Sequence, residues 1–308
     1  MHKLLITGVD SLVGINLAAV LSDRFEVHGL AGLHCVEIEN CHIRQADLTH
    51  PGEVAVAVDR VSPQWIIHCG PFSNSNWHPS EATIDNEPAV VTALLHAADE
   101  SGARLTVLST DAVLAGPDMF HSEESKSFSR SPAASGARAV EQLLESSSAL
   151  IVRTHAYGWG PSGSPNFAAE LWNTISEGRP CQTDCQRHAT PILATDLAEL
   201  LVRAFQRGAE GMYHLSGAER TSPARFAAEM AALCGVHVQA SAVDETSGRS
   251  DRALAVQETS LNTRRGRRDL GMAMPLLQEG LTRFAEQAEN GFRERIEFSA
   301  AALHEMAV

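Results

Sequence analysis

The sequence predicts an α/β fold, with a doubly wound parallel sheet followed by a smaller mixed lobe. Near-continuous apolar runs of strand length alternate with segments of helical periodicity through the first half of the chain. A glycine-containing turn follows the first apolar run directly. After residue 157 the pattern changes to turn-rich loops, helices and short strands. These observations predict one large α/β unit and a smaller C-terminal part.

Six apolar runs have the length and composition of buried strands. They are expected at 3–7, 25–30, 42–45, 64–69, 104–109 and 149–153. Helical periodicity separates several of them, at 12–22, 86–101 and 137–146. Because such strands are apolar on both faces, helices must cover both sides of the sheet.

We place the main boundary after residue 157. Residues 1–157 form the predicted dinucleotide-binding domain, 158–290 a smaller lobe interleaved with it in space, and 291–308 a tail. In the lobe, helices are expected at 167–177, 196–206, 222–235 and 275–290, and short strands at 212–215 and 236–240. Ligands of doubly wound folds lie beyond the carboxyl ends of the strands, so the lobe is placed to close over a second ligand.

The bulk properties exclude several classes of partner. The chain has 308 residues and a formal net charge of -14, which argues against nucleic acid as a main partner because phosphate backbones bind basic faces. No run of 18 apolar residues is present, so no membrane partner is expected. Six cysteines spread through a chain of this size do not form a disulfide framework, and a reducing, cytoplasmic location is expected.

The turn after the first strand is the strongest local sign of a cofactor, because it has the form of a Rossmann-type phosphate cradle. Gly8 allows the tight turn, Gly14 allows close packing of helix on strand, and the N-terminus of the helix offers N–H groups to a pyrophosphate. The middle position carries Ser11 instead of glycine. Either its hydroxyl donates a hydrogen bond to the phosphate, or the turn no longer binds. The residues assigned to the cofactor here are Gly8, Ser11, Leu12, Val13 and Gly14.

Two further strand ends are expected to contact the cofactor. Asp47 and Leu48 follow the third strand, where Asp47 accepts a hydrogen bond from an adenine amino group or instead caps a helix before Pro51. The fourth strand ends near the nicotinamide, at His68, Cys69 and Gly70. The second strand ends without an acidic residue or a nearby arginine, so the choice between NADP and NAD stays open.

Several sequence blocks recur in a fixed order and spacing. They include ITGVDSLVG, ADLTHP, PQWIIHCGP, VLSTDAVLAGP, ALIVRTHAYGWG, ATPILATDLAELL and GMYHLSG. Together they resemble the extended short-chain dehydrogenases/reductases, and within them the dTDP-4-dehydrorhamnose reductase branch, over roughly residues 3–288. The resemblance implies an NADP or NAD cofactor and a nucleotide sugar held by the C-terminal lobe.

The resemblance also implies roles for single residues. Thr110 would polarise the substrate carbonyl, with Asp111 beside it, and Asn86 would support a proton-relay water. Asn166 and Arg187 would contact the sugar nucleotide. Three of them have a structural alternative: Thr110 caps a loop at a strand end, Asn86 caps its helix, and Arg187 forms a surface salt bridge.

The hydride chemistry of the family depends on a Tyr and on a Lys four residues after it, on one helix. The Tyr donates a proton to the carbonyl oxygen, and the Lys lowers the Tyr pKa and holds the ribose. The corresponding segment, 131–141, contains neither residue type, and Tyr157 and Tyr213 fall in other blocks. Since losing a positioned acid costs about 10²–10⁴-fold in rate, efficient reduction by this route is not expected.

The alignment register of this segment stays open. The pairs at the Tyr and Lys positions are Ser135 with Ala139, Ala133 with Ala137, or Ala134 with Arg138, depending on the register. None of them restores the acid, and the nearest polar residues are Ser135 and Arg138. The histidines considered as substitute acids are His68, His78 and His121.

No metal site is expected. Cys181, Cys185 and His188 lack a matching second pair, and the His34-Cys35 and Cys41-His42 pairs would need a hairpin to form a zinc site. The basic cluster at 264–268 is expected to be a solvated helix face, with an anionic ligand as the alternative.

Three functions remain open. The first is a sugar-nucleotide reductase homologue with an altered catalytic helix. The second is a non-catalytic binding or regulatory protein, and the third is a relative that performs epimerisation or dehydration with other acid–base residues. A homodimer is an open alternative to a monomer.

Overall fold

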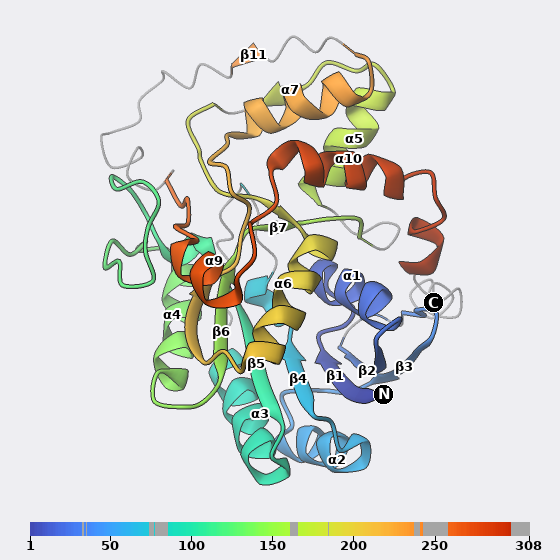
Figure 1. Ribbon diagram of the computed structural model, residues 1–308, viewed down its shortest axis with the longest axis vertical. Helices are drawn as coiled ribbons and strands as arrows, with labels where there is room; N and C mark the ends of the chain where they lie inside the picture. The colour runs from blue at the N-terminus through green and yellow to red at the C-terminus, as the bar shows by residue number, and fades with distance from the viewer. Residues whose placement is uncertain are drawn as a thin grey trace.

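A computed structural model of the chain describes residues 1–32, 34, 36–73, 77, 86–160, 166–183, 185–236, 241–242 and 258–296. Its centre is a sheet of seven parallel strands in the order β10-β6-β5-β4-β1-β2-β3 (Figure 1). The strands are β1 His2–Thr7, β2 Phe25–Ala31, β3 Cys41–Gln45, β4 Trp65–His68, β5 Arg104–Thr110, β6 Leu150–Thr154 and β10 Gly211–His214. The order runs outward in both directions from β1 and β4, so the predicted doubly wound fold is confirmed.

Helices cover both faces of this sheet. Helices α1 (Leu12–Leu21) and α6 (Ala194–Arg207) pack on one face with the side chains of Leu4 and Ile6 of β1. The other face buries Leu5 and Ile66 against three helices. These are α2 (Pro51–Val61), α3 (Glu87–Ser101) and α4 (Pro132–Leu144). Alternate residues of β1 thus enter two separate cores, as period-two geometry requires.

The C-terminal part lies over the carboxyl ends of the strands. Its helices are α5 (Phe167–Ser176), α7 (Pro223–Leu233), α9 (Arg264–Leu270) and α10 (Leu277–Gln287). Strand β7 (Ala156–Tyr157) pairs with β9 (Ile192–Leu193), and β8 (Gln182–Thr183) with β11 (Ser241–Ala242). Trp159 stacks on Phe284 of α10 with ring centroids 4.2 Å apart, which joins α10 to the segment that leaves the main sheet.

Several expected elements differ from those observed. The strand expected at 212–215 is β10, and it completes the main sheet beside β6 instead of belonging to the lobe. Helix α2 was not among the expected helices, although its buried residues have helical spacing. Helix α4 begins at Pro132 rather than at residue 137, because Ser131 accepts a hydrogen bond from the Ala134 N–H and proline suits the first turn. Most of the strand expected at 236–240 lies outside the described residues.

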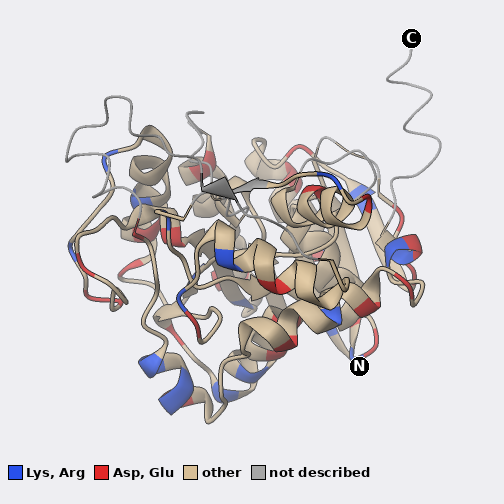
Figure 2. Cartoon of the chain, turned by 90° about the horizontal axis from the view of Figure 1, so that it is seen from above, with Lys and Arg blue, Asp and Glu red and all other residues tan. Residues whose placement is uncertain are grey.

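Charges of both signs are interspersed along the chain (Figure 2). The basic cluster forms α9, where Arg268 pairs with Asp269 at 2.7 Å and Arg265 lies over the ring of Tyr213. Asp269 is thus the acidic partner of two of the four arginines in this cluster. None of the described helices is both long and apolar enough to span a membrane. Of the tail, the structure describes a short 3-10 helix at Arg293–Ile296.

Candidate functional site

The topological switch point between β1 and β4 forms one end of the candidate site. Gly8, directly after β1, has φ +69°, and a Cβ there would overlap the carbonyl oxygen of Cys69. A Cβ on Gly14 would overlap the carbonyl oxygen of Gly8. Both positions therefore require glycine, for the reasons the sequence predicted: a left-handed turn and close approach of helix to strand.

Ser11 is the N-cap of α1. Its Oγ accepts a hydrogen bond from the Gly14 N–H at 3.0 Å, so the oxygen occupies one donor of the cradle. The Leu12 and Val13 N–H groups lie in the first turn, ahead of the Ile15 to Ser11 hydrogen bond, and remain available to a ligand. Because the Ser11 hydroxyl proton can also be donated, the turn fits a pyrophosphate despite lacking its middle glycine.

Asp10 was not singled out from the sequence, but the structure places it in contact with the end of β2. Its carboxylate accepts hydrogen bonds from the N–H groups of Gly32 and His34, both at 3.1 Å. In doubly wound folds the ribose of the adenosine half lies at this strand end. The Asp10 carboxylate therefore lies at the strand end where doubly wound folds bind the ribose 2′ position, the position at which NAD and NADP differ.

A buried chain of three side chains spans the switch point. Thr7 Oγ1 lies 2.7 Å from His68 Nδ1, and His68 Nε2 lies 2.7 Å from Glu87 Oε1. Both ring nitrogens of His68 are engaged, so this histidine does not have a free nitrogen for a substrate. Gly70 packs directly against the pair. Burial strongly raises the pKa of the neighbouring Cys69 thiol, which keeps it protonated and unreactive.

Asp47 lies in an exposed turn before α2. Its carboxylate accepts hydrogen bonds from the N–H and hydroxyl of Thr49, and these bonds lower the pKa of the carboxyl group. The N-cap of α2 is His50, so the predicted alternative of Asp47 as the cap is wrong. Leu48 packs at the edge of the core under α2.

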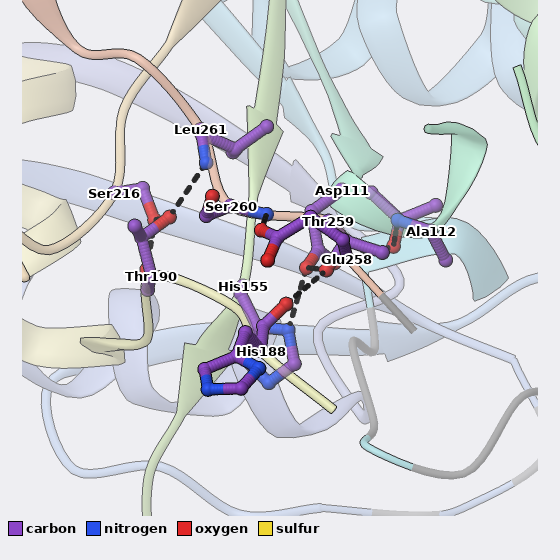
Figure 3. A network of polar contacts seen from close by, with 11 residues as sticks. Asp111, Ala112, His155, His188, Thr190, Ser216, Glu258, Thr259, Ser260 and Leu261 are labelled. Atoms are coloured by element: carbon purple, nitrogen blue, oxygen red, sulfur yellow. Dashed lines mark hydrogen bonds and ion pairs between the residues drawn. The ribbon is translucent and has the colours of Figure 1, made fainter. Parts of the chain in front are cut away.

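The ends of β5 and β6 bring together a histidine and a carboxylate. Nδ1 of His155 lies 2.9 Å from Oδ2 of Asp111, and the Thr259 hydroxyl contacts the same carboxylate (Figure 3). His155 is 2 % exposed, and its Nε2 has no hydrogen-bond partner within the described residues. Its ring lies against Trp77 with centroids 4.8 Å apart, and the Trp77 Nε1 is also without a partner there.

Thr110 precedes this pair. Its Oγ1 accepts a hydrogen bond from the Ala112 N–H at 3.1 Å and so caps the short 3-10 helix Asp111–Val113. The hydroxyl lies 3.3 Å from Oδ1 of Asp111. Thr110 thus caps a loop, as its structural alternative predicted. It also lies next to Asp111, the carboxylate that contacts His155.

The orientation of α4 is fixed by a buried ion pair. Glu141 accepts two hydrogen bonds from Arg153 of β6, at 2.6 and 2.8 Å, and one from the Ser109 hydroxyl of β5 at 2.6 Å. Residues four and eight positions earlier share this helix face, and they are Ala137 and Ala133. On the two turns before Glu141, this face therefore carries alanines.

The other polar residues considered on α4 are engaged elsewhere. Ser135 is exposed, and its hydroxyl donates to the Ser131 carbonyl within the same helix. The guanidinium of Arg138 lies over the ring of Phe128, 3.3 Å from its centroid. Both side chains therefore already have a contact within the protein.

The remaining predicted site residues have local roles. Asn86 occupies the N-cap position of α3, is exposed, and makes no side-chain cap bond. Asn166 caps α5, since its Oδ1 accepts from the Ala169 N–H at 2.8 Å. Arg187 donates to the Trp77 carbonyl at 2.6 Å, which places it close to the ring that covers His155. His121 contacts Ser125 and Glu258 through its two ring nitrogens, and His78 lies outside the described residues.

Comparisons with known proteins agree with this architecture. The family model described as the RmlD substrate binding domain matches residues 1–290. No curated protein matches the chain. Among solved structures, it is similar to a hypothetical dTDP-4-dehydrorhamnose reductase from Sulfolobus tokodaii, with 22% identity, a TM-score of 0.71, and coverage of 86% of this chain and 94% of that one.

Two further structures contain ligands. The Bacillus anthracis dTDP-4-dehydrorhamnose reductase in complex with NADP has 20% identity and a TM-score of 0.74, with 93% of this chain and 99% of that chain covered. The Bordetella bronchiseptica enzyme WbmG in complex with NAD and UDP has 15% identity and a TM-score of 0.77, with 97% and 99% covered. At these identities the structures establish the fold alone.

Proposed function

Because the chain belongs to the RmlD substrate-binding domain family, as its sequence blocks predicted, we propose that it binds a nicotinamide dinucleotide and a nucleotide sugar without the Tyr/Lys pair of the family. The observation that carries the proposal is the alanine face of α4. Glu141 fixes that face against Ser109 and Arg153, and Ala133 and Ala137 stand on it.

Dinucleotide binding is supported by the geometry at the switch point. Gly8 and Gly14 have the conformations a phosphate cradle needs, and the Leu12 and Val13 N–H groups remain available. The cofactor would supply or accept hydride, and this chain's residues would hold its phosphates and ribose. The NADP complex of the B. anthracis reductase and the NAD and UDP complex of WbmG support the same ligand classes.

The position of Asp10 favours NAD over NADP. Its carboxylate already accepts hydrogen bonds from the N–H groups of Gly32 and His34 at the end of β2. A 2′-phosphate at that strand end would be repelled by the like charge of Asp10. It also could not use these two backbone N–H groups, because they already donate to Asp10. A ribose 2′-OH, in contrast, can donate a hydrogen bond to the carboxylate.

The His155–Asp111 pair favours proton transfer as a second candidate function. A carboxylate on Nδ1 orients the ring and stabilises an imidazolium, which leaves Nε2 to donate or accept a proton. Asp111 directly follows Thr110, the residue that the resemblance assigns to the substrate carbonyl. Epimerisation, dehydration or slow reduction could use such a group in place of a tyrosine.

One titration series tests these functions. The protein is titrated with NADH and NADPH by fluorescence, then mixed with UDP- and dTDP-linked 4-keto sugars while nicotinamide absorbance and product composition are followed. Tight NADH binding without turnover supports the binding protein, and turnover that depends on His155 supports the second candidate. If neither cofactor binds, the proposed function is wrong.

A further inference from the structure

A cluster of metal-ligating side chains lies on the sheet, apart from the candidate site. Glu26 and His28 are two residues apart on β2 and therefore share one face of the sheet. His42 of β3 lies directly opposite His28 in the parallel register. The two imidazole centroids are 4.9 Å apart, and His28 Nε2 lies 3.0 Å from Glu26 Oε1.

The geometry points to a site for a divalent transition metal of the Zn²⁺ class, formed by His28, His42 and Glu26. One potential ligand atom from each residue lies within 4.8 Å of the other two. Tetrahedral zinc with bonds of about 2.0–2.1 Å needs its ligands about 3.3–3.5 Å apart, so the cluster must contract by little more than 1 Å. His42 is exposed and can supply that movement by side-chain rotation.

The ligand set selects the class of ion. Two imidazole nitrogens and one carboxylate suit Zn²⁺, Ni²⁺, Co²⁺ or Cu²⁺, whereas Ca²⁺ and Mg²⁺ prefer all-oxygen shells. The side chains of His28 and Glu26 are partly exposed, so water can complete the coordination. A site with three protein ligands and one open position is more similar to the zinc sites that exchange a ligand than to closed structural sites, in which the protein supplies all four ligands.

Neighbouring residues sharpen the assignment. Cys41 is adjacent to His42 but faces the opposite side of the strand, where its thiol donates to the Ala18 carbonyl. Lys3 Nζ lies 3.9 Å from Glu26 Oε1, and it is the cation that a bound metal would displace.

A bound ion would join the edge strand to its neighbour. Strand β3 is at the end of the sheet and has β2 as its only strand partner within it. An ion bound by both His28 and His42 would link the two paired strands. It would stabilise the folded state, because the site exists only when the strands are paired. The site lies ahead of the carboxyl ends of β2 and β3, so it is independent of the proposed cofactor crevice.

The test uses the full chain without an affinity tag, freed of metal by chelation and titrated with ZnCl₂ by calorimetry. One ion per chain is expected, and a hundredfold excess over the dissociation constant should raise the melting temperature by roughly 5 °C. His42→Ala should weaken binding by about tenfold or more, because even indirect partners of a metal ligand contribute about 10–100-fold. Lys3→Gln should strengthen it, because the competing cation is removed.

Two matched variants distinguish this site from adventitious binding. His50→Ala removes another exposed histidine that has a carboxylate partner, and Cys185→Ser removes an exposed thiol. Neither should change the affinity. Zinc binding that is unchanged in His42→Ala, or that is lost in Cys185→Ser, overturns the site. Metal-free melting curves that match the parent protein show that each variant folds, and NADH titration reports the cofactor crevice separately.

Discussion

Nδ1 of His155 lies 2.9 Å from the carboxylate of Asp111, and the ring thereby joins the ends of β5 and β6. The two residues are 44 positions apart in sequence. The pair is buried, and Nε2 of the histidine has no partner in the described part of the chain. This arrangement is the one that the second candidate function requires.

The second candidate function predicts that replacing His155 by Asn abolishes most turnover and preserves cofactor binding. We expect a loss of about 10²–10⁴-fold in kcat, the usual contribution of a positioned acid or base. The matched control is His188→Asn, which changes a histidine of the same polar network whose Nδ1 contacts the Gln186 carbonyl. Equal activity in the His155 and His188 variants, measured over a pH series, would contradict the role of His155.

Restoring the family's pair on α4 should create or increase reductase activity. The double variant Ala133→Tyr with Ala137→Lys places both groups on the face fixed by Glu141. A gain of about 10²-fold or more in NADH oxidation with a 4-keto nucleotide sugar is expected. Ser135→Tyr with Ala139→Lys tests a second of the three registers, and a gain there instead would show that the family pair does not belong at Ala133 and Ala137.

Changing Asp10 to Asn should shift cofactor preference towards NADPH. Removing the carboxylate charge at the end of β2 should improve NADPH affinity relative to NADH by roughly five- to tenfold, or about 1 kcal/mol for a partly screened charge pair. Fluorescence titration of both cofactors measures the ratio. Asp23→Asn makes the same charge change at an exposed position, and a similar shift in that variant would remove the case for Asp10.

Breaking the Glu141–Arg153 pair should destabilise the fold strongly. Both side chains are about 4 % exposed, so Glu141→Ala leaves a buried guanidinium without its partner and should lower the free energy of unfolding by about 3–5 kcal/mol. The exposed pair of Arg24 and Glu199 is the control, and Glu199→Ala should cost no more than about 1 kcal/mol. Urea denaturation measures both, and comparable losses would show that the buried pair is not a special contact.

His214 should make stability fall as the pH is lowered. Burial, and then the charge of Arg153, lower its pKa to about 3, well below the ordinary value of 6.5. The unfolded chain therefore binds the proton first, so the contribution of His214 is complete above about pH 6.5 and is lost progressively towards pH 3. Between pH 7 and 5.5 the loss is about 1 kcal/mol.

The comparison variant for this pH effect is His214→Gln, which removes the titrating group. Its urea unfolding free energy should change less between the two pH values than that of the parent protein. His50→Gln, at an exposed position, should keep the parent's pH dependence. Parallel pH curves for all three proteins would rule out His214 as the source.

The glycine turn and the composition of α4 could be predicted because their signals are local. Gly8 and Gly14 are required by backbone conformation within one turn, and the absence of Tyr and Lys from α4 is visible in eleven consecutive positions, 131–141. The sequence shows that Ser11 replaces the middle glycine of the turn. Its hydrogen bond with the Gly14 N–H could not be predicted, because that bond depends on where α1 begins. The strand expected at 212–215 was found as β10, but its place beside β6 was not predicted, because the periodicity of a short strand does not reveal which strand it pairs with.

By itself, the sequence determined the doubly wound class, the glycine turn after β1, the family and the absence of Tyr and Lys from 131–141, since each depends on periodicity or on residues close together in the chain. Only the tertiary structure decided which side chains meet: His155 with Asp111, Asp10 with the end of β2, and His28 with His42. Those contacts join different strands, and their register is set by the packing of the whole sheet between its two helical layers.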